Sequence, residues 1–346
     1  MTPPATSKSK EFENVLVTGG AGYIGSHVAS QLIENGYRVF VLDNLTTGHR
    51  WAVHPKANLT VGNVGDFQLV QKLLKDNNIK SVLHFAANIE VPESVANPLK
   101  YYRNNTGQAV AFLEACIASD VERFIFSSTA AVYGMPTVKS ITETTPQEPI
   151  NPYGRSKLFS EHVIRDLGAS PLNNNKFRYV ILRYFNVAGA KSDGTIGQAT
   201  PNATHLLKVA CETTLGMRKS ITVFGTDYDT KDGTCIRDYI HVDDLASAHI
   251  LSLGHLEKGG ASNLYNCGYG HGFSVKDVLD TVQKISGTKI DIQYGSRRAG
   301  DPDSVVADST KIRKELGWTP KHDDLSFICK TALDWEKKLL AKKNQQ

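Results

Sequence analysis

The sequence contains few cysteines and no long apolar run. Its five cysteines are never closer together than 24 residues and form no C-x-x-C pair, which excludes a disulfide framework and a zinc knuckle. No stretch approaches the ~20 apolar residues that a membrane helix needs, and residues 1–13 contain no apolar signal-peptide core. We therefore expect a cytoplasmic protein that does not associate with a membrane.

The sequence also lacks a large excess of positive or negative charge. The chain has 39 Lys and Arg against 35 Asp and Glu, a net charge of +4 that is spread along the sequence, which argues against a nucleic-acid-binding surface. The eleven histidines form no metal-ligand cluster, and the G-x-S-x-G motif of serine hydrolases is absent. Neither a metal site nor a serine nucleophile is predicted.

The 346 residues do show a regular alternation of short apolar runs and helical patterns. Such alternation predicts βαβ units and a doubly wound parallel sheet of Rossmann type, with a smaller C-terminal substrate lobe. The predicted strands are 14–18, 37–43, 81–85 and 123–127, and the predicted helices are 26–35, 69–77 and 107–119.

The domain boundaries follow from where this regularity weakens. We expect a Rossmann domain over 12–189, to which 238–254 returns as a helix, and a lobe made of 190–237 and 255–336. Strand-like pieces within that lobe are 220–224 and 289–294. Residues 1–11 and 337–346 are predicted to be tails.

A glycine-rich turn follows the first predicted strand. Gly19, Gly22 and Gly25 form G-x-x-G-x-x-G before a helix, a pattern that lets the backbone approach a pyrophosphate at the helix N-terminus. Asp43 ends the second strand, 18 residues after Gly25, where a carboxylate can bind the adenosine ribose. Since a carboxylate there repels a 2′-phosphate, NAD is favoured over NADP. A P-loop is excluded because Ser26 and His27 follow, with no lysine.

A second pattern combines a tyrosine, a lysine and a hydroxyl. Tyr153 and Lys157 are four residues apart on a predicted helix and therefore share one face. An ammonium beside a phenol favours the phenolate, so we expect a lowered pKa for Tyr153. Thr129 follows the fourth strand, at the sheet edge where open α/β sheets bind ligands. These three residues are the predicted catalytic group.

The motifs together resemble the extended short-chain dehydrogenase/reductase family, and within it the UDP-hexose 4-epimerases. The resemblance covers about residues 14–336 and is carried by TGGAGYIGSH, VLDNLTTG, HFAA, FSSTAAVYG, NPYGRSK, LRYFNVAGA and the run 224–245. The last of these is the most specific to the epimerase subgroup. The resemblance implies a cytoplasmic, homodimeric NAD enzyme of galactose metabolism.

The resemblance also implies a set of residues around NAD. Asn63 stands where the family usually has Asp, and Ile89 where some members have a Lys that contacts the cofactor. The implied cofactor-binding residues are Gly19, Gly22, Tyr23, Ile24, Gly25, Asp43, Asn44, Leu45, Thr46, Thr47, Gly48, Asn63, Val64, Phe85, Ala86, Ala87, Asn104, Tyr153, Lys157 and Phe185.

The nucleotide-sugar site is implied in the same way. Thr129 stands where many relatives have Ser, and the segment Ala203-Thr204-His205 differs from the Asn-Leu version of the family. Guanidinium groups suit a diphosphate because they bind its oxygens bidentately. The implied substrate-binding residues are Thr129, Tyr153, Asn186, Thr204, His205, Thr222, Phe224, Arg237, Arg298, Asp301 and Val305.

The activity implied is inversion of C4 of a UDP-hexose through a 4-keto intermediate. Val305 stands where some epimerases carry Tyr beside the C2 substituent, so UDP-N-acetylhexosamines are expected substrates as well. Apolar residues of 107–119 and 152–166 are expected in a dimer interface: Ala109, Val110, Phe112, Leu113, Leu158, Phe159 and Val163.

Two alternatives remain open. A sugar 4,6-dehydratase, or a UDP-glucuronate decarboxylase or epimerase, would use the same fold, but dehydratases place Asp-Glu after the strand-end Thr, where this chain has Ala130-Ala131. A non-catalytic NAD-binding protein is the other, although it would have no reason to keep Thr129, Tyr153 and Lys157 together.

Overall fold

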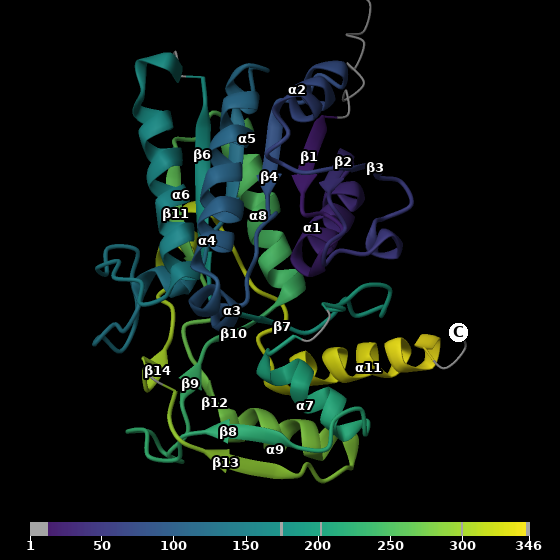
Figure 1. Cartoon of the computed structure of the whole chain (residues 1–346), viewed down its shortest axis with the longest axis vertical. Coiled ribbons are helices and arrows are strands. Elements are labelled where there is room, and N and C mark those ends of the chain that lie inside the picture. Colours follow the sequence, from purple (N-terminus) through teal and green to yellow (C-terminus); the bar gives the residue numbers. More distant parts are fainter. Residues whose placement is uncertain (1–12, 174–175, 201–202, 299, 344–346) are drawn as a thin grey trace, which may run out of the picture.

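A seven-stranded parallel sheet dominates the computed structural model, which describes residues 13–173, 176–200, 203–298 and 300–343 (Figure 1). The strand order is β3-β2-β1-β4-β5-β6-β11, so the chain starts in the middle and winds outward in both directions, as in dinucleotide-binding folds. The strands are β1 (Asn14–Thr18), β2 (Arg38–Asp43), β3 (Asn58–Val61), β4 (Ser81–His84), β5 (Arg123–Ser127), β6 (Arg178–Tyr184) and β11 (Asn263–Cys267).

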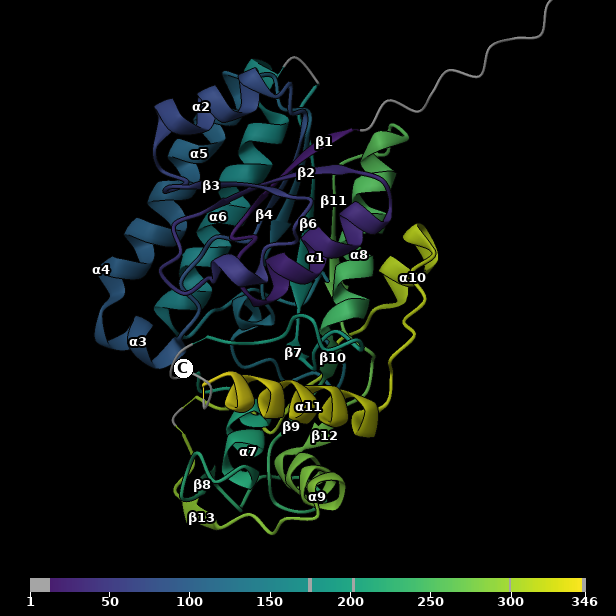
Figure 2. The ribbon, with the colours of Figure 1, turned by 90° about the vertical axis from the view of Figure 1, so that its right-hand side faces the viewer.

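Helices cover both faces of this sheet (Figure 2). Alternate strand residues point to opposite faces, so Val15 and Val17 join one core cluster and Leu16 the other. The first face carries α1 (Tyr23–Glu34), α8 (Val242–Glu257) and α10 (Thr310–Leu316). The second carries α2 (Phe67–Asp76), α5 (Gln108–Ile117) and α6 (Pro152–Ala169), with α3 (Val91–Ala96) and α4 (Pro98–Tyr101) nearby.

A smaller lobe lies beyond the carboxyl ends of the strands (Figure 1). Its strands are short because glycine, aspartate and proline interrupt the apolar runs. They are β7 (Asn186–Ala188) with β10 (Tyr239–His241), β8 (Ile221–Phe224) with β13 (Ile292–Gly295), and β9 (Ile236–Arg237) between β12 (Phe273–Ser274) and β14 (Ser304–Val305). Its helices are α7 (Leu206–Thr214), α9 (Val275–Ser286) and α11 (Leu325–Lys343).

The predicted fold class is confirmed, and the four predicted strands of the main sheet agree within one residue with β1, β2, β4 and β5. Several details differ. Strands β3 and β6 were not predicted, and β7 and β10, which lie within the predicted Rossmann segments, pair with each other outside the main sheet. The helix expected over 238–254 begins at Val242. The first helix begins at Tyr23 because Gly22 is its N-cap. Strand β11, assigned above to the lobe, pairs with β6 in the main sheet. Residues 337–343, assigned to a tail, continue helix α11.

Two further expectations concern the chain ends and membranes. The predicted tail 1–11 and residues 344–346 lie outside the described residues. No described helix combines the length and the apolar character needed to cross a bilayer.

Candidate active site

The glycine turn between β1 and α1 fits a dinucleotide. Gly19 has φ +69°, and a Cβ on it would lie 2.8 Å from the backbone nitrogen of Ala86. A Cβ on Gly25 would lie 2.2 Å from the carbonyl oxygen of Gly19, so only glycine fits at both positions. Tyr23, Ile24 and Gly25 open α1, where N–H groups have no preceding helical turn to donate to. The turn is therefore a cradle for a pyrophosphate.

The side chain of Tyr23 points elsewhere. Its hydroxyl donates to the carbonyl oxygen of Gly189 at 2.6 Å, and burial raises its pKa. This bond ties α1 to the segment that follows β7. Because this hydroxyl is engaged, only the backbone N–H of Tyr23 can contact a pyrophosphate.

Asp43 ties the glycine turn to the loop after β2. Its carboxylate is 7% exposed and accepts the N–H groups of Ala21 at 3.0 Å and Leu45 at 2.8 Å. Each carboxylate oxygen keeps a lone pair for a ribose hydroxyl. Beside it, the Asn44 amide donates to Asn63 Oδ1 at 2.8 Å. Asn63, the departure from the usual Asp, thus bonds to the residue that follows Asp43 and carries a polar group there.

The remaining predicted cofactor residues lie at the same edge of the sheet. They follow the carboxyl ends of β2, β3, β4 and β6, except for Asn104, which lies in a π-helical turn before α5. They are Thr46, Thr47, Gly48, Val64, Phe85, Ala86, Ala87, Asn104 and Phe185.

Thr129 and Tyr153 meet beyond the end of β5. Thr129 Oγ1 accepts the N–H of Ala131 at 3.1 Å, so the Thr129 hydroxyl proton is directed at Tyr153 in this structure and can be donated to a substrate oxygen in a complex. Tyr153 is the second residue of α6 and is 9% exposed. Burial raises the pKa of Tyr153, while a hydrogen bond with Thr129 opposes that rise.

Lys157 lies one helical turn after Tyr153 and is 3% exposed. Its Nζ donates to the carbonyl oxygen of Ser127 at 2.8 Å, and burial lowers its pKa to about 7. The expected lowering of the pKa of Tyr153 is therefore wrong for the protein alone. Desolvation of the phenol dominates, and the lysine is directed at a backbone carbonyl.

The lobe gathers most of the predicted nucleotide-sugar residues. The Arg237 guanidinium pairs with the Asp301 carboxylate and also donates to the carbonyl oxygens of Ile236 at 2.7 Å and Pro302 at 3.0 Å. Val305 lies opposite Arg237 in the β14–β9 pairing. Arg237 is thus anchored within the protein and presents its remaining donors to a ligand.

A second arginine lies at the end of β8. The Arg298 guanidinium stacks on the ring of Phe224 at 4.0 Å and donates to none of the described side chains or carbonyls. Thr222 and Phe224 share the exposed face of β8. Stacking leaves the edge of the guanidinium available for phosphate oxygens.

The segment before α7 contributes two further predicted residues. Thr204 donates from Oγ1 to Glu90 Oε2 at 2.9 Å. His205 lines a small cavity of about 40 Å³ together with Asn186, and its ring contacts the Gln198 amide at 3.0 Å. Burial lowers the pKa of His205. The structure therefore brings Asn186 and His205 together, and joins Thr204 to the loop after β4.

Comparison with known proteins agrees with this geometry. Residues 15–268 match the family described as "NAD dependent epimerase/dehydratase family". The chain belongs to that family. It is 51% identical over 334 residues to the UDP-glucose 4-epimerase of Azospirillum brasilense, covering 96% of this chain and 95% of the relative.

Solved structures of other epimerases resemble this family member closely. UDP-glucose 4-epimerase from Brucella ovis in complex with NAD superimposes with a TM-score of 0.90 at 42% identity, over 93% of this chain and 98% of that one. The UDP-Glc/GlcNAc 4-epimerase from Campylobacter jejuni gives 0.83 at 50% identity, over 94% and 99%. This epimerase/dehydratase chain is therefore an NAD-dependent isomerase.

Sequence reasoning missed a buried ionic network beneath the predicted catalytic group of this epimerase. Glu161 and Arg183 are both fully buried and pair at 2.5 Å. Ser128 donates to Glu161 Oε1 at 2.5 Å, and Arg183 donates to the Tyr133 hydroxyl at 3.0 Å. The network holds the residue before Thr129. Two signals pointed to it: Glu161 is four residues after Lys157, and Arg183 is a charge in an apolar strand.

Asn105 was also missed, although its neighbour Asn104 was predicted. Its Oδ1 accepts the N–H of Asn88 at 2.8 Å, and its amide donates to the Asn88 carbonyl at 2.9 Å and Ser156 Oγ at 3.0 Å. Ser156 lies between Tyr153 and Lys157 on α6. Asn105 therefore fixes the loop after β4 against the helix that carries both.

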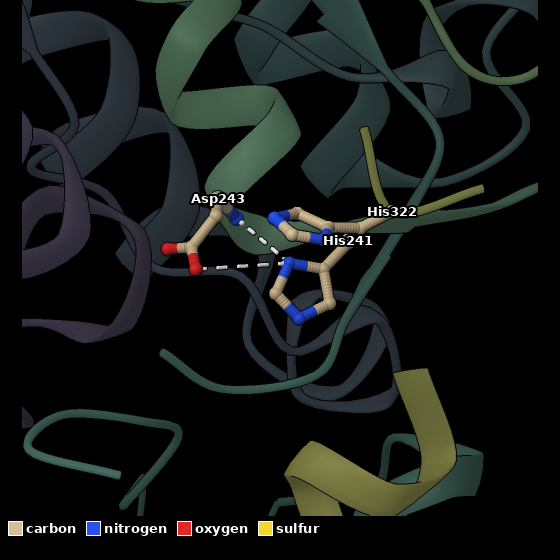
Figure 3. Close-up of side chains that lie close together, drawn as sticks. All are labelled: His241, Asp243 and His322. Carbon is tan, nitrogen blue, oxygen red and sulfur yellow. Dashed lines mark hydrogen bonds and ion pairs between the residues drawn. The ribbon is translucent and has the colours of Figure 1, made fainter. Parts of the chain in front are cut away.

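One group of metal-ligand type occurs in the part of this epimerase that the structure describes. Ligand atoms of His241, Asp243 and His322 lie within 4.8 Å of one another (Figure 3). His241 Nδ1, however, accepts the N–H of Asp243 at 3.1 Å as the cap of α8, and Nε2 contacts Thr331 Oγ1 at 3.3 Å. Burial lowers the pKa of His241 to about 3. Because both ring nitrogens of His241 are engaged, this residue acts as the N-cap of α8.

Proposed function

We propose that this chain is an NAD-dependent UDP-hexose 4-epimerase that interconverts UDP-glucose and UDP-galactose through a 4-keto sugar. The observation that carries the proposal is the juxtaposition of Thr129 and the buried Tyr153 beyond β5, with Lys157 one turn further along α6. The glycine cradle at the same sheet edge and the arginines of the lobe provide places for a dinucleotide and a diphosphate.

Each residue of the catalytic group has a separate role in the proposed reaction. Tyr153 takes the proton of the C4 hydroxyl and later returns it, while Thr129 donates a hydrogen bond to that oxygen. The glycine turn and Asp43 would hold NAD, which would supply reversible hydride exchange at C4 and a positive charge that favours the phenolate disfavoured by burial alone. Lys157 adds positive charge on the same side and anchors α6 to the end of β5.

The two lobes divide these tasks. The parts of 12–189 and 238–254 that form the main sheet and its helices would hold NAD, and β11 extends that sheet. The nucleotide-sugar lobe would use Arg237 and Arg298 for the diphosphate and close over the ketone. Rotation of the sugar about its diphosphate linkage would present its other face to the same hydride.

A wider substrate range is also part of the proposal. Val305 is half-buried beside the apolar cluster that includes Tyr133, Leu158 and Phe185. A valine there leaves room beside the sugar that a tyrosine would fill. The Campylobacter relative is described as acting on both UDP-Glc and GlcNAc forms. We expect UDP-N-acetylglucosamine and UDP-N-acetylgalactosamine to be substrates too.

A homodimer is proposed through the exposed side of α3 to α6. Val95, Leu99, Val110 and Phe159 are 64%, 70%, 36% and 47% exposed. Apolar side chains gathered on neighbouring helices are typical of an interface. Four residues expected there are instead buried within the monomer and pack in its own cores: Ala109, Phe112, Leu113 and Leu158.

The proposed compartment is the cytoplasm. All five cysteines are free and buried, and burial raises the pKa of the Cys116 thiol. Unpaired thiols of this kind suit a reducing environment.

One of the alternative activities, 4,6-dehydration, lacks a catalytic group. Ala130 and Ala131 open the turn after Thr129, where a dehydratase would need an acid and a base.

The deciding experiment is conversion of UDP-galactose to UDP-glucose by the purified NAD-loaded chain, with Tyr153→Phe as the matched control. Conversion by the wild type alone supports the proposal, and no conversion by either protein refutes it.

A further inference from the structure

Glu90 is a carboxylate in this site to which neither the fold nor the proposed mechanism assigns a task. Its backbone is rigidly held: the Glu90 carbonyl accepts the Tyr101 hydroxyl at 2.7 Å and the Ser94 N–H at 3.0 Å. Its Oε2 accepts the hydroxyl of Thr204 at 2.9 Å. Its Oε1 is buried and has no hydrogen-bond partner among the described residues.

The segment that carries Glu90 is connected to α6, the helix of Tyr153 and Lys157. Asn88, two residues earlier, is bound by Asn105, which also donates to Ser156 on α6. Helix α3, which Glu90 caps, packs against α6. The charge of Glu90 also raises the pKa of Tyr153. The carboxylate is therefore bound to Thr204, and its charge acts on Tyr153.

No cation neutralises Glu90 in the described part of the chain. The nearby Lys100 pairs with Glu93 at 2.5 Å, and Lys208 pairs with Glu336 at 2.6 Å. Although Glu90 favours the charged form of His205, burial outweighs it and lowers the pKa of that ring. A buried carboxylate oxygen without a donor is costly, and a ligand hydroxyl would relieve that cost.

We infer that Glu90 selects neutral hexoses: its free oxygen accepts a hydrogen bond from a sugar hydroxyl, and its charge excludes sugars that carry a carboxylate. The inference rests on the proposed epimerase function. A hexuronate brings a second carboxylate into a desolvated site without a compensating cation. Like charges in such surroundings repel strongly, so UDP-glucuronate and UDP-galacturonate should be poor substrates.

The test compares two substrates in one protein. Purified NAD-loaded wild type and Glu90→Gln are assayed for kcat/KM with UDP-galactose and UDP-galacturonate. We expect the wild type to favour UDP-galactose by ~100-fold or more, as buried unpaired groups typically discriminate. Glu90→Gln keeps a carbonyl acceptor and removes the charge. This variant should therefore raise kcat/KM for UDP-galacturonate ~10-fold or more and lower kcat/KM for UDP-galactose by ~10-fold at most.

Two further variants separate specificity from structure. Glu93→Gln removes a charge three residues away on α3 and should leave the ratio of the two kcat/KM values unchanged. Glu90→Ala removes the hydrogen-bond acceptor as well as the charge, and it should lower kcat/KM for UDP-galactose more than Glu90→Gln does.

The outcomes distinguish the two proposals. If the wild type is active and Glu90→Gln has the same ratio of kcat/KM values for the two substrates, the role of Glu90 is refuted while the proposed function stands. The same holds if the wild type already converts UDP-galacturonate as well as UDP-galactose. A wild type that converts neither sugar refutes the proposed function, and this inference with it.

Discussion

Removing one partner of the buried Glu161–Arg183 pair should destabilise the protein severely. In Arg183→Met the Glu161 carboxylate stays at 0% exposure and keeps Ser128 as a donor at 2.5 Å, with Arg165 3.8 Å away. Breaking a buried ion pair in this way typically costs ~3–5 kcal/mol, because one charge is left desolvated without its partner. We expect the free energy of unfolding of Arg183→Met to fall by that amount.

The same physics predicts that a second substitution repairs the first. Replacing both side chains, Glu161→Leu with Arg183→Met, removes both desolvated charges and should recover at least half of the loss. As a control, Asp334→Asn breaks an ion pair with Lys330 whose side chains are 64% and 45% exposed, and it should cost less than ~1 kcal/mol.

The assay is urea unfolding of the NAD-loaded proteins at neutral pH, with turnover of UDP-galactose measured in parallel. Ser128 precedes Thr129, so Arg183→Met should also lower kcat more than the double variant does. A loss below ~1 kcal/mol in Arg183→Met would refute the argument that the pair neutralises a desolvated carboxylate.

Three other predictions test the site, the core and the interface. Val305→Tyr should suppress turnover of the UDP-N-acetylhexosamines by ~10–100-fold and spare UDP-galactose; equal loss of both activities would contradict the proposed pocket. Burial lowers the pKa of His249 to about 4 in the folded protein, whereas in the unfolded chain this side chain has its ordinary pKa of 6.5. Between these two pH values the unfolded chain therefore binds a proton at His249 that the folded protein does not. The free energy of unfolding should therefore fall as the pH drops from 6.5 to 4. In urea unfolding, His249→Phe should make this pH dependence shallower by ~1.4 kcal/mol per pH unit. An unchanged pH dependence would show that His249 is not buried in its neutral form. Leu99→Asp, at a side chain 70% exposed, should convert a dimer to a monomer in light scattering; a monomeric wild type at micromolar concentration would exclude the interface.

Local rules were enough for the parts of the fold that depend on neighbours in the chain. The glycine turn was predictable because positive φ and close backbone approach both demand glycine, and Gly19 shows both. Tyr153 and Lys157 were predictable as a pair because helical periodicity sets an i, i+4 spacing. Four strands of the main sheet, β1, β2, β4 and β5, were visible as apolar runs between turns, whereas β3 and β6 were not predicted.

Tertiary structure alone decided what depends on segments far apart in the chain. Strand β11 joins the main sheet because its buried residues pair with β6. Residues 337–343 continue α11, a helix that packs on α7 and α9. Glu90 meets Thr204 across 114 residues. Burial, a property of the whole fold, raises the pKa of Tyr153, whereas the spacing from Lys157 predicted the opposite. Steric and helical rules act over a few residues, but desolvation and ion pairing depend on every segment that closes around a group.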